Sequence, residues 1–311
     1  MKIVAALGGN AIIRYREEGT AEEQLGHIDT AVAPLARMAA AGHRILITHG
    51  NGPQVGDILL QNECAREAVP RMPLDVCGAE SQGMIGYMIQ QRMEERLSMR
   101  SVRTPVVTLL TRTLVDPDDP AFHDPTKGIG PYYTDAEARR IIEDEGWQMR
   151  KTEGRGWRRI VPSPSPVTIL EIDAIRTLFD AGAVVIAGGG GGVPVIWREG
   201  HLAGVEAVVD KDRAAAYIAE GIGADLLMML TDVPGVYTGF GTADQLLIRS
   251  MDLKGAGDLL AAGECEEGSM APKVAAAVRF VERTDTCAVI AHLDDAESAL
   301  AGESGTRITP A

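Results

Sequence analysis

Hydrophobic residues in this chain gather in short runs, and stretches with a single apolar face lie between the runs. A run such as "VVIA" has no polar position, which is typical of a strand buried on both faces of a parallel sheet. Because these runs are short, strands are favoured over buried helices. The pattern predicts six such strands, at residues 3–7, 44–48, 106–110, 184–187, 226–230 and 288–291.

The stretches between the runs carry apolar residues every three or four positions, as the inner face of a helix does. Between residues 22 and 41, for example, Leu25, Ile28, Val32 and Leu35 share one such face. Similar patterns predict helices over residues 76–97, 212–221 and 271–283. Strands that alternate with helices indicate an α/β protein, a three-layer αβα sandwich with a mostly parallel central sheet.

Residues 115–166 interrupt this alternation. The segment is rich in proline and charge, and its stretch "GWQMRKTEGRGWRRIVPSPSP" predicts a hairpin that turns near Gly154. We expect a single domain over residues 1–311 with residues 115–166 inserted as a lid subdomain, because long insertions in compact domains are often functional. A surface insertion without a role in the site is the alternative.

The formal net charge of −14 at pH 7 argues against a nucleic-acid partner, because an acidic surface repels phosphate backbones. A few lysines inside a cleft still suffice to attract a small anion. The four cysteines form no C-x-x-C pair and fit free thiols in a reducing compartment. With no signal-peptide pattern and no apolar run of ~18 residues, the sequence predicts a cytoplasmic protein without a membrane partner.

Glycine-rich or polar turns follow four of the predicted strands: "GGN", "HGNG", "GGGGG" and "TDVPGVY". The carboxyl ends of parallel strands meet at one edge of a sheet, and ligands bind beyond that edge. Glycine lets backbone amides approach a ligand closely. We therefore expect a shared anion-binding rim along this edge.

The turn "GNGPQVG" joins a predicted strand to a predicted helix. It matches the relaxed pattern G-x-G-x-x-x-G, but Val55 stands where the tight dinucleotide fingerprint has its last glycine. Pro53 suits the first turn of a helix, whose free amides favour an anion. The turn "GGN", with Gly8, Gly9 and Asn10, offers similar donors. In both places a plain structural turn is the alternative.

Five glycines in a row at residues 188–192 lose much conformational entropy when they become ordered. The run directly follows a predicted strand and precedes the apolar stretch "VPVI". Close approach of the backbone to a ligand explains this position better than the alternative, a flexible linker.

Three lysines lie where a phosphoryl-transfer site would use them. Lys127 lies in the expected lid, Lys211 stands between Asp210 and Asp212, and Lys273 lies just inside a predicted helix. Each lysine alone is explained as a solvated surface residue, but together with the glycine turns they resemble an electrostatic clamp for a phosphoryl group. The chain has no Walker A, H-R-D or D-F-G motif, which excludes P-loop enzymes and protein kinases.

Several long motifs occur in order along the chain, namely "THGNGPQVGDILLQNE", "DDPAFHDPTKGIGP", "GRGWRRIVPSPSP", "GVEAVVDKD", "LTDVPGVYTGFG" and "GSMAPKVAAAVRFVE". Because of these motifs, nearly the whole chain resembles the carbamate kinases of the amino acid kinase superfamily. The resemblance implies a homodimeric enzyme that transfers a phosphoryl group reversibly between ATP plus carbamate and ADP plus carbamoyl phosphate. It also implies Mg²⁺ bound mainly through the nucleotide phosphates, and a link to arginine metabolism.

The resemblance further implies a role for each matching residue. The acceptor side lies mainly in the N-terminal part, where carbamate would contact Gly8, Gly9, Asn10, Gly50, Asn51 and Gly52. The catalytic residues would be Lys127, Lys211, Lys273 and Asp210, with the carboxylate orienting the lysines. The nucleotide side lies mainly in residues 212–311, and the residues that would bind the nucleotide are Gly189, Gly190, Thr231, Asp232, Val236, Tyr237, Met270 and Lys273.

Three positions depart from the family pattern. Gly128 stands where proline usually follows the lid lysine, Ala271 replaces a glycine, and Glu80 adds a charge near the acceptor region. A kinase of the same superfamily with another small carboxylate or phosphonate acceptor is the first alternative function. A catalytically silent nucleotide-binding regulator is the second, and the presence of all three lysines and Asp210 argues against it.

Overall fold

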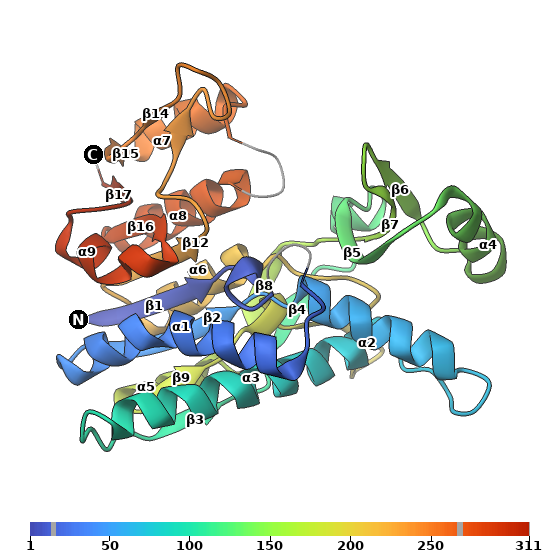
Figure 1. The fold of residues 1–311 in the computed structure, drawn as a ribbon, viewed down its shortest axis with the longest axis horizontal. Helices are drawn as coiled ribbons and strands as arrows, with labels where there is room; N and C mark the ends of the chain where they lie inside the picture. The colour runs from blue at the N-terminus through green and yellow to red at the C-terminus, as the bar shows by residue number, and fades with distance from the viewer. Residues whose placement is uncertain (14–16, 266–269, 311) are drawn as a thin grey trace.

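The computed structural model describes residues 1–13, 17–265 and 270–310, and of Asn10 the backbone alone. A sheet of eight strands forms its centre: β1 (Lys2–Leu7), β2 (Arg44–His49), β3 (Val106–Thr108), β9 (Val184–Ile186), β12 (Leu226–Thr231), β15 (Ser250–Asp252), β16 (Cys287–His292) and β17 (Thr306–Thr309). The strands lie in the order β15–β17–β16–β12–β1–β2–β9–β3 (Figure 1). All neighbouring pairs are parallel except β16 and β17, which run antiparallel.

Each of the six predicted strands is present in this sheet, and the predicted fold class is confirmed. The central strand β1 pairs with a neighbour on each side, so that Ile3 lies opposite Ile45 of β2 and Leu226 of β12. The last two residues predicted for the third strand lie outside it, because β3 ends at Thr108. Beyond that point Leu110 is exposed, and the chain enters a second sheet.

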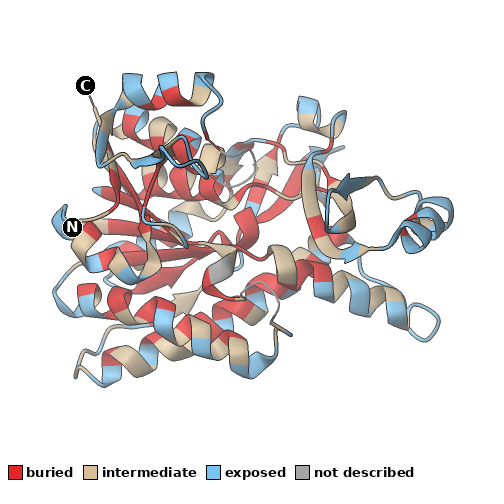
Figure 2. Ribbon diagram, turned by 45° about the horizontal axis from the view of Figure 1, so that its top comes forward, coloured by how far each residue is buried: buried red, intermediate tan, exposed pale blue. Residues whose placement is uncertain are grey.

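Helices cover both faces of the central sheet. One layer contains α1 (Ala21–Ala40), α3 (Leu74–Ser98) and α9 (Ala296–Ala301), and the other contains α5 (Ile172–Asp180), α6 (Lys211–Ile222), α7 (Leu253–Ala261) and α8 (Met270–Thr284). The alternation of side chains along β1 decides which layer each residue meets. Ile3 and Leu7 share a core with α1 and α3, whereas Val4 and Ala6 share one with α5, α6 and α8. Figure 2 shows the buried strands between the two layers.

A second sheet flanks the predicted insertion. Its strands are β4 (Arg112–Val115), β8 (Pro166–Ile169), β10 (Val193–Arg198) and β11 (His201–Gly204), in the order β11–β10–β4–β8. The insertion leaves at the end of β4 and returns at the start of β8, and these two strands pair antiparallel. Both ends of the insertion are therefore held in one sheet.

Residues 127–161 form a projecting subdomain that stands clear of the central sheet (Figure 1). It consists of β5 (Lys127–Tyr133), α4 (Asp135–Glu145), β6 (Met149–Thr152) and β7 (Gly156–Val161). The predicted hairpin is formed by β6 and β7, which pair antiparallel, and Gly154 lies in its turn with a φ of +71°. A lid function for this subdomain stays a prediction.

The projecting subdomain rests on α2 (Gly52–Ala65) and on the segment that follows it. The backbones of Gly56 and Gly130 touch, because a Cβ added to Gly56 would lie 2.1 Å from the Gly130 Cα. Farther out, the Glu145 carboxylate of α4 accepts a hydrogen bond of 2.5 Å from Arg71. A small apolar core joins the two parts, made of Val55, Leu74, Cys77, Ile129 and Val161.

The remaining short elements are η1 (Gly9–Ala11), η2 (Pro120–Phe122), η3 (Gly189–Gly191), η4 (Leu293–Asp295), β13 (Tyr237–Thr238) and β14 (Leu246–Leu247). Within the described part of the chain, no helix combines the length and the apolar character that crossing a membrane requires. The cytoplasmic location stays a prediction.

Candidate active site

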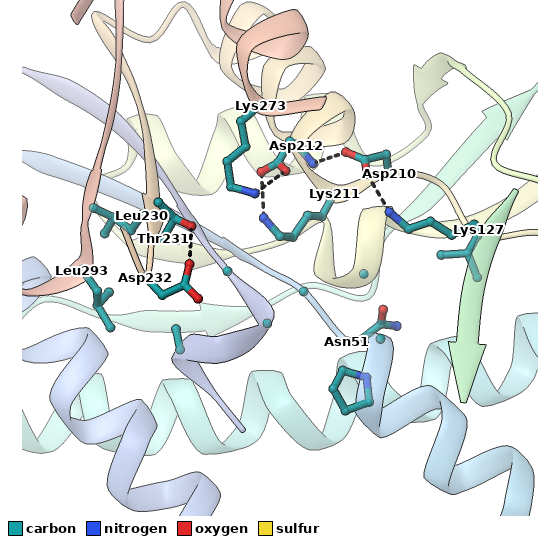
Figure 3. Close-up of a pocket in the computed structure, with 18 of the residues that line it drawn as sticks. Asn51, Lys127, Asp210, Lys211, Asp212, Leu230, Thr231, Asp232, Lys273 and Leu293 are labelled. Carbon is teal, nitrogen blue, oxygen red and sulfur yellow. Dashed lines mark hydrogen bonds and ion pairs between the residues drawn. The ribbon is translucent and has the colours of Figure 1, made fainter. Parts of the chain in front are cut away.

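A cleft of about 800 Å³ opens at the carboxyl-terminal edge of the central sheet. Its lining comes from the segments that follow β1, β2, β12 and β16, from the first turn of α6, and from β5 of the projecting subdomain (Figure 3). Most residues predicted for the site lie here: Gly8, Gly9, Gly50, Asn51, Gly52, Lys127, Gly190, Asp210, Lys211, Thr231, Asp232 and Lys273.

Four residues predicted to bind nucleotide do not line this cleft. Gly189 faces the buried His49, and Val236 is fully buried in the core. The Tyr237 ring lies beside Phe240, and Met270 begins α8. The side chain of Asn10 and the residues Gly268 and Ser269 lie outside the described part of the chain. Nucleotide contacts at these positions stay predictions.

Asp210 caps α6 and also holds the lysine of the projecting subdomain. Its Oδ1 accepts hydrogen bonds from the amides of Asp212 (2.9 Å) and Arg213 (3.3 Å), as an N-cap carboxylate does. Its Oδ2 accepts a hydrogen bond of 2.8 Å from Lys127 Nζ. Burial alone would raise the pKa of Asp210, but the ammonium groups of Lys127 and Lys211 and the Asp212 amide together hold that pKa well below its usual range. Asp210 therefore stays a carboxylate.

Asp212 joins the other two lysines, as the dashed lines in Figure 3 show. Lys211 Nζ lies 2.7 Å from Oδ1 of Asp212, and Lys273 Nζ lies 3.2 Å from Oδ2. Burial lowers the pKa of Lys273, and the nearby Lys211 charge lowers it further, while Asp212 opposes both. One buried carboxylate thus holds two ammonium groups side by side.

The sequence analysis did not assign Asp212 to the site, although "VVDKD" contains a usable signal. Lys211 is the first residue of α6, where the helix dipole disfavours a cation. A lysine in that position needs compensation by neighbouring acids, and Asp210 and Asp212 supply it. Further lining residues that sequence reasoning missed are Thr126, Arg158, His27, Thr30, His292, Leu293 and Asp294.

The turn after β2, where carbamate is predicted to bind, lies next to Lys211. Asn51 is the N-cap of α2, and its side chain donates a hydrogen bond of 2.8 Å to Ser81 of α3. A Cβ added to Gly50 would lie 3.2 Å from Lys211 Cδ and 3.3 Å from the Gly9 amide nitrogen. Glycine at position 50 therefore lets the turns after β1 and β2 close around Lys211.

His49 lies beneath this turn and carries no charge at neutral pH. Its side chain is buried, and its Nδ1 lies 2.9 Å from the carbonyl oxygen of Gly50. Burial lowers the pKa of His49 to about 4, although the hydrogen bond to Gly50 acts in the opposite direction. The imidazole is therefore a neutral support for the turn.

The five-glycine run packs between two loops of the site. Gly188, Gly190, Gly191 and Gly192 all have positive φ values, between 61° and 90°. A Cβ on Gly190 would lie 2.2 Å from Asn51 Nδ2, and one on Gly191 would lie 2.2 Å from the carbonyl oxygen of Val209. Close approach of the backbone to neighbouring protein segments thus accounts for these two glycines, and Gly190 also lines the cleft.

The three departures from the family pattern lie in different surroundings. The Glu80 side chain is exposed on α3 and does not line the cleft, although the next residue, Ser81, accepts a hydrogen bond from Asn51. Its place near the acceptor region stays a prediction. Ala271 packs against the core on α8. Gly128 does line the cleft, next to Lys127.

Comparison with known proteins identifies the family. A sequence model of the "Amino acid kinase family" matches residues 1–292. Carbamate kinase from Pyrococcus horikoshii is 45% identical over 311 residues, covering 99% of each chain. Carbamate kinase from Halobacterium salinarum is 48% identical over 312 residues, covering 99% of this chain and 98% of that protein. This chain belongs to the carbamate kinases.

A solved carbamate kinase has the same fold as this chain. The structure of Giardia lamblia carbamate kinase bound to AMP-PNP matches with a TM-score of 0.93 and 40% sequence identity, covering 100% of this chain and 98% of that one. Membership of the carbamate kinases, and the resemblance seen in the motifs, are therefore confirmed.

Proposed function

We propose that this carbamate kinase transfers a phosphoryl group reversibly between ATP plus carbamate and ADP plus carbamoyl phosphate. The observation that carries the proposal is the meeting of Lys127, Lys211 and Lys273 at one cleft, from elements far apart in the sequence. Asp210 and Asp212 hold their ammonium groups in place. Fixed positive charge of this kind stabilises the loose, anionic transition state of phosphoryl transfer.

The acceptor would lie against the turn after β2, where amides of the first turn of α2 favour an anion. Carbamate is already an oxyanion nucleophile, so the reaction needs no strong general base. The neutral His49 beneath the turn is consistent with a reaction that needs no strong base, because the uncharged imidazole adds no charge beside the anion. Alignment and charge neutralisation would supply the catalysis.

The nucleotide would lie on the other side of Lys211, toward Lys273, Thr231 and Asp232, which line the opposite side of the cleft from Asn51 and Lys127 (Figure 3). Lys273 would then neutralise charge on the phosphates of ATP. Its place in the first turns of α8 supports this role, because the helix N-terminus adds to the positive potential.

Mg²⁺ would enter the site with the nucleotide. Within the described residues, no group of three or more His, Cys, Asp or Glu side chains is placed to hold a metal ion. Asp210 and Asp212 are already engaged by lysines. Mg²⁺ commonly keeps several waters and binds through substrate phosphates, which fits this set of donors. When bound, it neutralises phosphate charge.

A homodimer is also part of the proposal. Tyr87 of α3, Leu110 after β3 and Trp197 of β10 are exposed to 64%, 49% and 57%, and α3 packs against both β3 and β10. Large exposed apolar side chains on adjoining elements favour a protein interface. Sedimentation of the purified protein would measure its mass in solution. A monomer at micromolar concentration would contradict the proposed homodimer.

Coupled measurement of ATP formation from ADP and carbamoyl phosphate tests the function. We expect ATP to form and a chelator of Mg²⁺ to abolish its formation. ADP release from ATP across carbamate, acetate, acylated amino acids and phosphonates tests the acceptor, and faster turnover with an acid other than carbamate would favour the alternative kinase. Tight ADP binding without turnover on any acceptor would favour a silent regulator.

A further inference from the structure

Strand β7 presents two neighbouring arginines to opposite sides of the projecting subdomain. Side chains alternate along a strand, so Arg158 and Arg159 face in opposite directions. Arg159 donates a hydrogen bond of 2.7 Å to Glu206, and its guanidinium lies 4.1 Å from the centre of the Trp147 ring. Arg158 instead lines the cleft together with Lys127. The two arginines therefore have different surroundings.

The charge on Arg158 is not compensated by a carboxylate of the described residues. Lys127, Lys211 and Lys273 each contact Asp210 or Asp212, whereas Arg158 makes no ion pair with any described residue. Its Nε donates a hydrogen bond of 2.9 Å to the carbonyl oxygen of Gly130, and its guanidinium carbon lies 5.3 Å from the centre of the Tyr132 ring. These contacts hold the side chain while leaving the Nη donors for a ligand.

Gly128 provides the space in which Arg158 lies. A Cβ at position 128 would lie 3.1 Å from Arg158 Cδ and 3.5 Å from Nη1. Contacts of 3.0–3.4 Å are tighter than ordinary packing, so a side chain at position 128 would require Arg158 to shift by a few tenths of an ångström. The departure from the family pattern at Gly128 is thus coupled to the position of Arg158.

Arg158 lies on the acceptor side of the cleft. Its hydrogen-bond partner Gly130 touches Gly56 of α2, the helix whose first turn is proposed to receive the acceptor. In Figure 3, β5 with Lys127 stands near Asn51, whereas Lys273 and Asp232 lie at the other side. A guanidinium in this place matches the geometry of a carboxylate or phosphate, because it donates two parallel hydrogen bonds.

We propose that Arg158 is a further substrate-binding residue, whose guanidinium binds oxygen atoms of the acceptor: carbamate in one direction and carbamoyl phosphate in the other. The inference rests on the proposed function and adds a residue to the same site. Arg158 approaches with Lys127 from the projecting subdomain, so both contacts form on the same face of the acceptor. Gly128 tunes this contact by leaving room for the arginine.

Steady-state kinetics of Arg158→Gln and Arg158→Lys in the ATP-forming direction test the proposal. Loss of charge-assisted hydrogen bonds should raise the KM for carbamoyl phosphate roughly 10- to 100-fold in Arg158→Gln, with the KM for ADP changed less than about twofold. Arg158→Lys keeps the positive charge but loses the two parallel hydrogen bonds of the guanidinium. Its KM for carbamoyl phosphate should therefore lie between those of the wild type and Arg158→Gln. Lys151→Gln is the matched control, because it removes a lysine of β6 that pairs with Asp135 instead of lining the cleft.

An unchanged KM for carbamoyl phosphate in Arg158→Gln would overturn the proposal, as would an equal rise in both KM values. An equal rise in Lys151→Gln would overturn it as well, because the effect would then belong to the overall charge of the subdomain. Gly128→Ala should raise the same KM in the wild-type background and have no further effect in Arg158→Gln. An equal effect in both backgrounds would contradict the coupling.

Wild-type protein without turnover would contradict the proposed function. The anion contact of Arg158 would then be tested by ligand binding instead of kinetics. Calorimetry of wild type and Arg158→Gln with inorganic phosphate serves that purpose. Binding that is roughly tenfold or more weaker in the variant supports the anion contact, and equal binding overturns it.

Discussion

The Lys127 ammonium lies 2.8 Å from the carboxylate of Asp210 and thereby joins the projecting subdomain to the first turn of α6. Asp210 has a second task, because its other oxygen caps α6 through two backbone amides. A single side chain therefore fixes the helix that begins with Lys211 and the strand that begins with Lys127. Replacing Asp210 by asparagine and, separately, by alanine distinguishes its effect on Lys127 from its effect on the helix cap.

Asp210→Asn should lower kcat on the order of 10- to 100-fold, because the charge that orients Lys127 is lost while the cap remains. Asp210→Ala should lower kcat at least as much and should also reduce the free energy of unfolding by about 1 kcal/mol relative to Asp210→Asn, since alanine cannot cap. Urea unfolding and steady-state rates measure both effects. Equal stability of the two variants would contradict the capping role.

Asp212→Asn tests the buried carboxylate that joins Lys211 and Lys273. Asp212 raises the pKa of Lys273 against the effects of burial and of Lys211, so its loss should lower that pKa further. If the protonated amine binds phosphate, the alkaline limb of the pH–kcat profile should move to lower pH in the variant. Asp173→Asn, in the exposed first turn of α5, is the control. An alkaline limb that stays in place would contradict the assignment of Lys273.

The six apolar runs predicted the strand positions closely. A strand that is buried on both faces is apolar along its whole length, so it can be recognised in the sequence. Sequence reasoning also found Lys127, Lys211 and Lys273, because together with the glycine turns they resemble an electrostatic clamp for a phosphoryl group. It could not find the pairing of Lys273 with Asp212, which lies 61 residues away and depends on the packing of α6 against α8. Nor could it see that Val236 is buried, because an apolar residue in a turn motif can equally face a ligand or the core.

Gly190→Ala tests whether the five-glycine run is needed for packing at the site. A Cβ at this position would lie 2.2 Å from Asn51 Nδ2, so Asn51 must move and kcat should fall on the order of 10². Gly200→Ala is a matched control, because Gly200 also has a positive φ of 82° but nothing within 4 Å of the added Cβ. The control should lose only about 1–2 kcal/mol of stability and keep its turnover. Equal turnover in the two variants would contradict the packing argument.

His49 should make the protein sensitive to acid. The pKa of His49 is about 4 in the folded protein against 6.5 for an ordinary histidine, so below pH 6.5 the unfolded chain binds the proton more readily. Stability is therefore lost as the pH falls from 6.5 toward 4, by about 3 kcal/mol in all for this group.

Urea unfolding of wild type and His49→Gln at several pH values measures this loss. The variant should show a shallower loss of stability over that range, because glutamine does not titrate. His201→Gln, on an exposed strand residue, should keep the steeper loss of the wild type. Identical pH profiles in wild type and His49→Gln would show that the buried imidazole is not responsible.

The central claim is that fixed ammonium groups at one cleft stabilise a phosphoryl group in transfer, and Lys211 stands at its centre. The most direct measurement is kcat for ATP formation from ADP and carbamoyl phosphate by Lys211→Ala, with Lys254→Ala on the exposed side of α7 as control. We predict a loss of roughly 10²–10³ in kcat for Lys211→Ala and wild-type turnover for the control. Turnover close to that of wild type in Lys211→Ala would contradict the account.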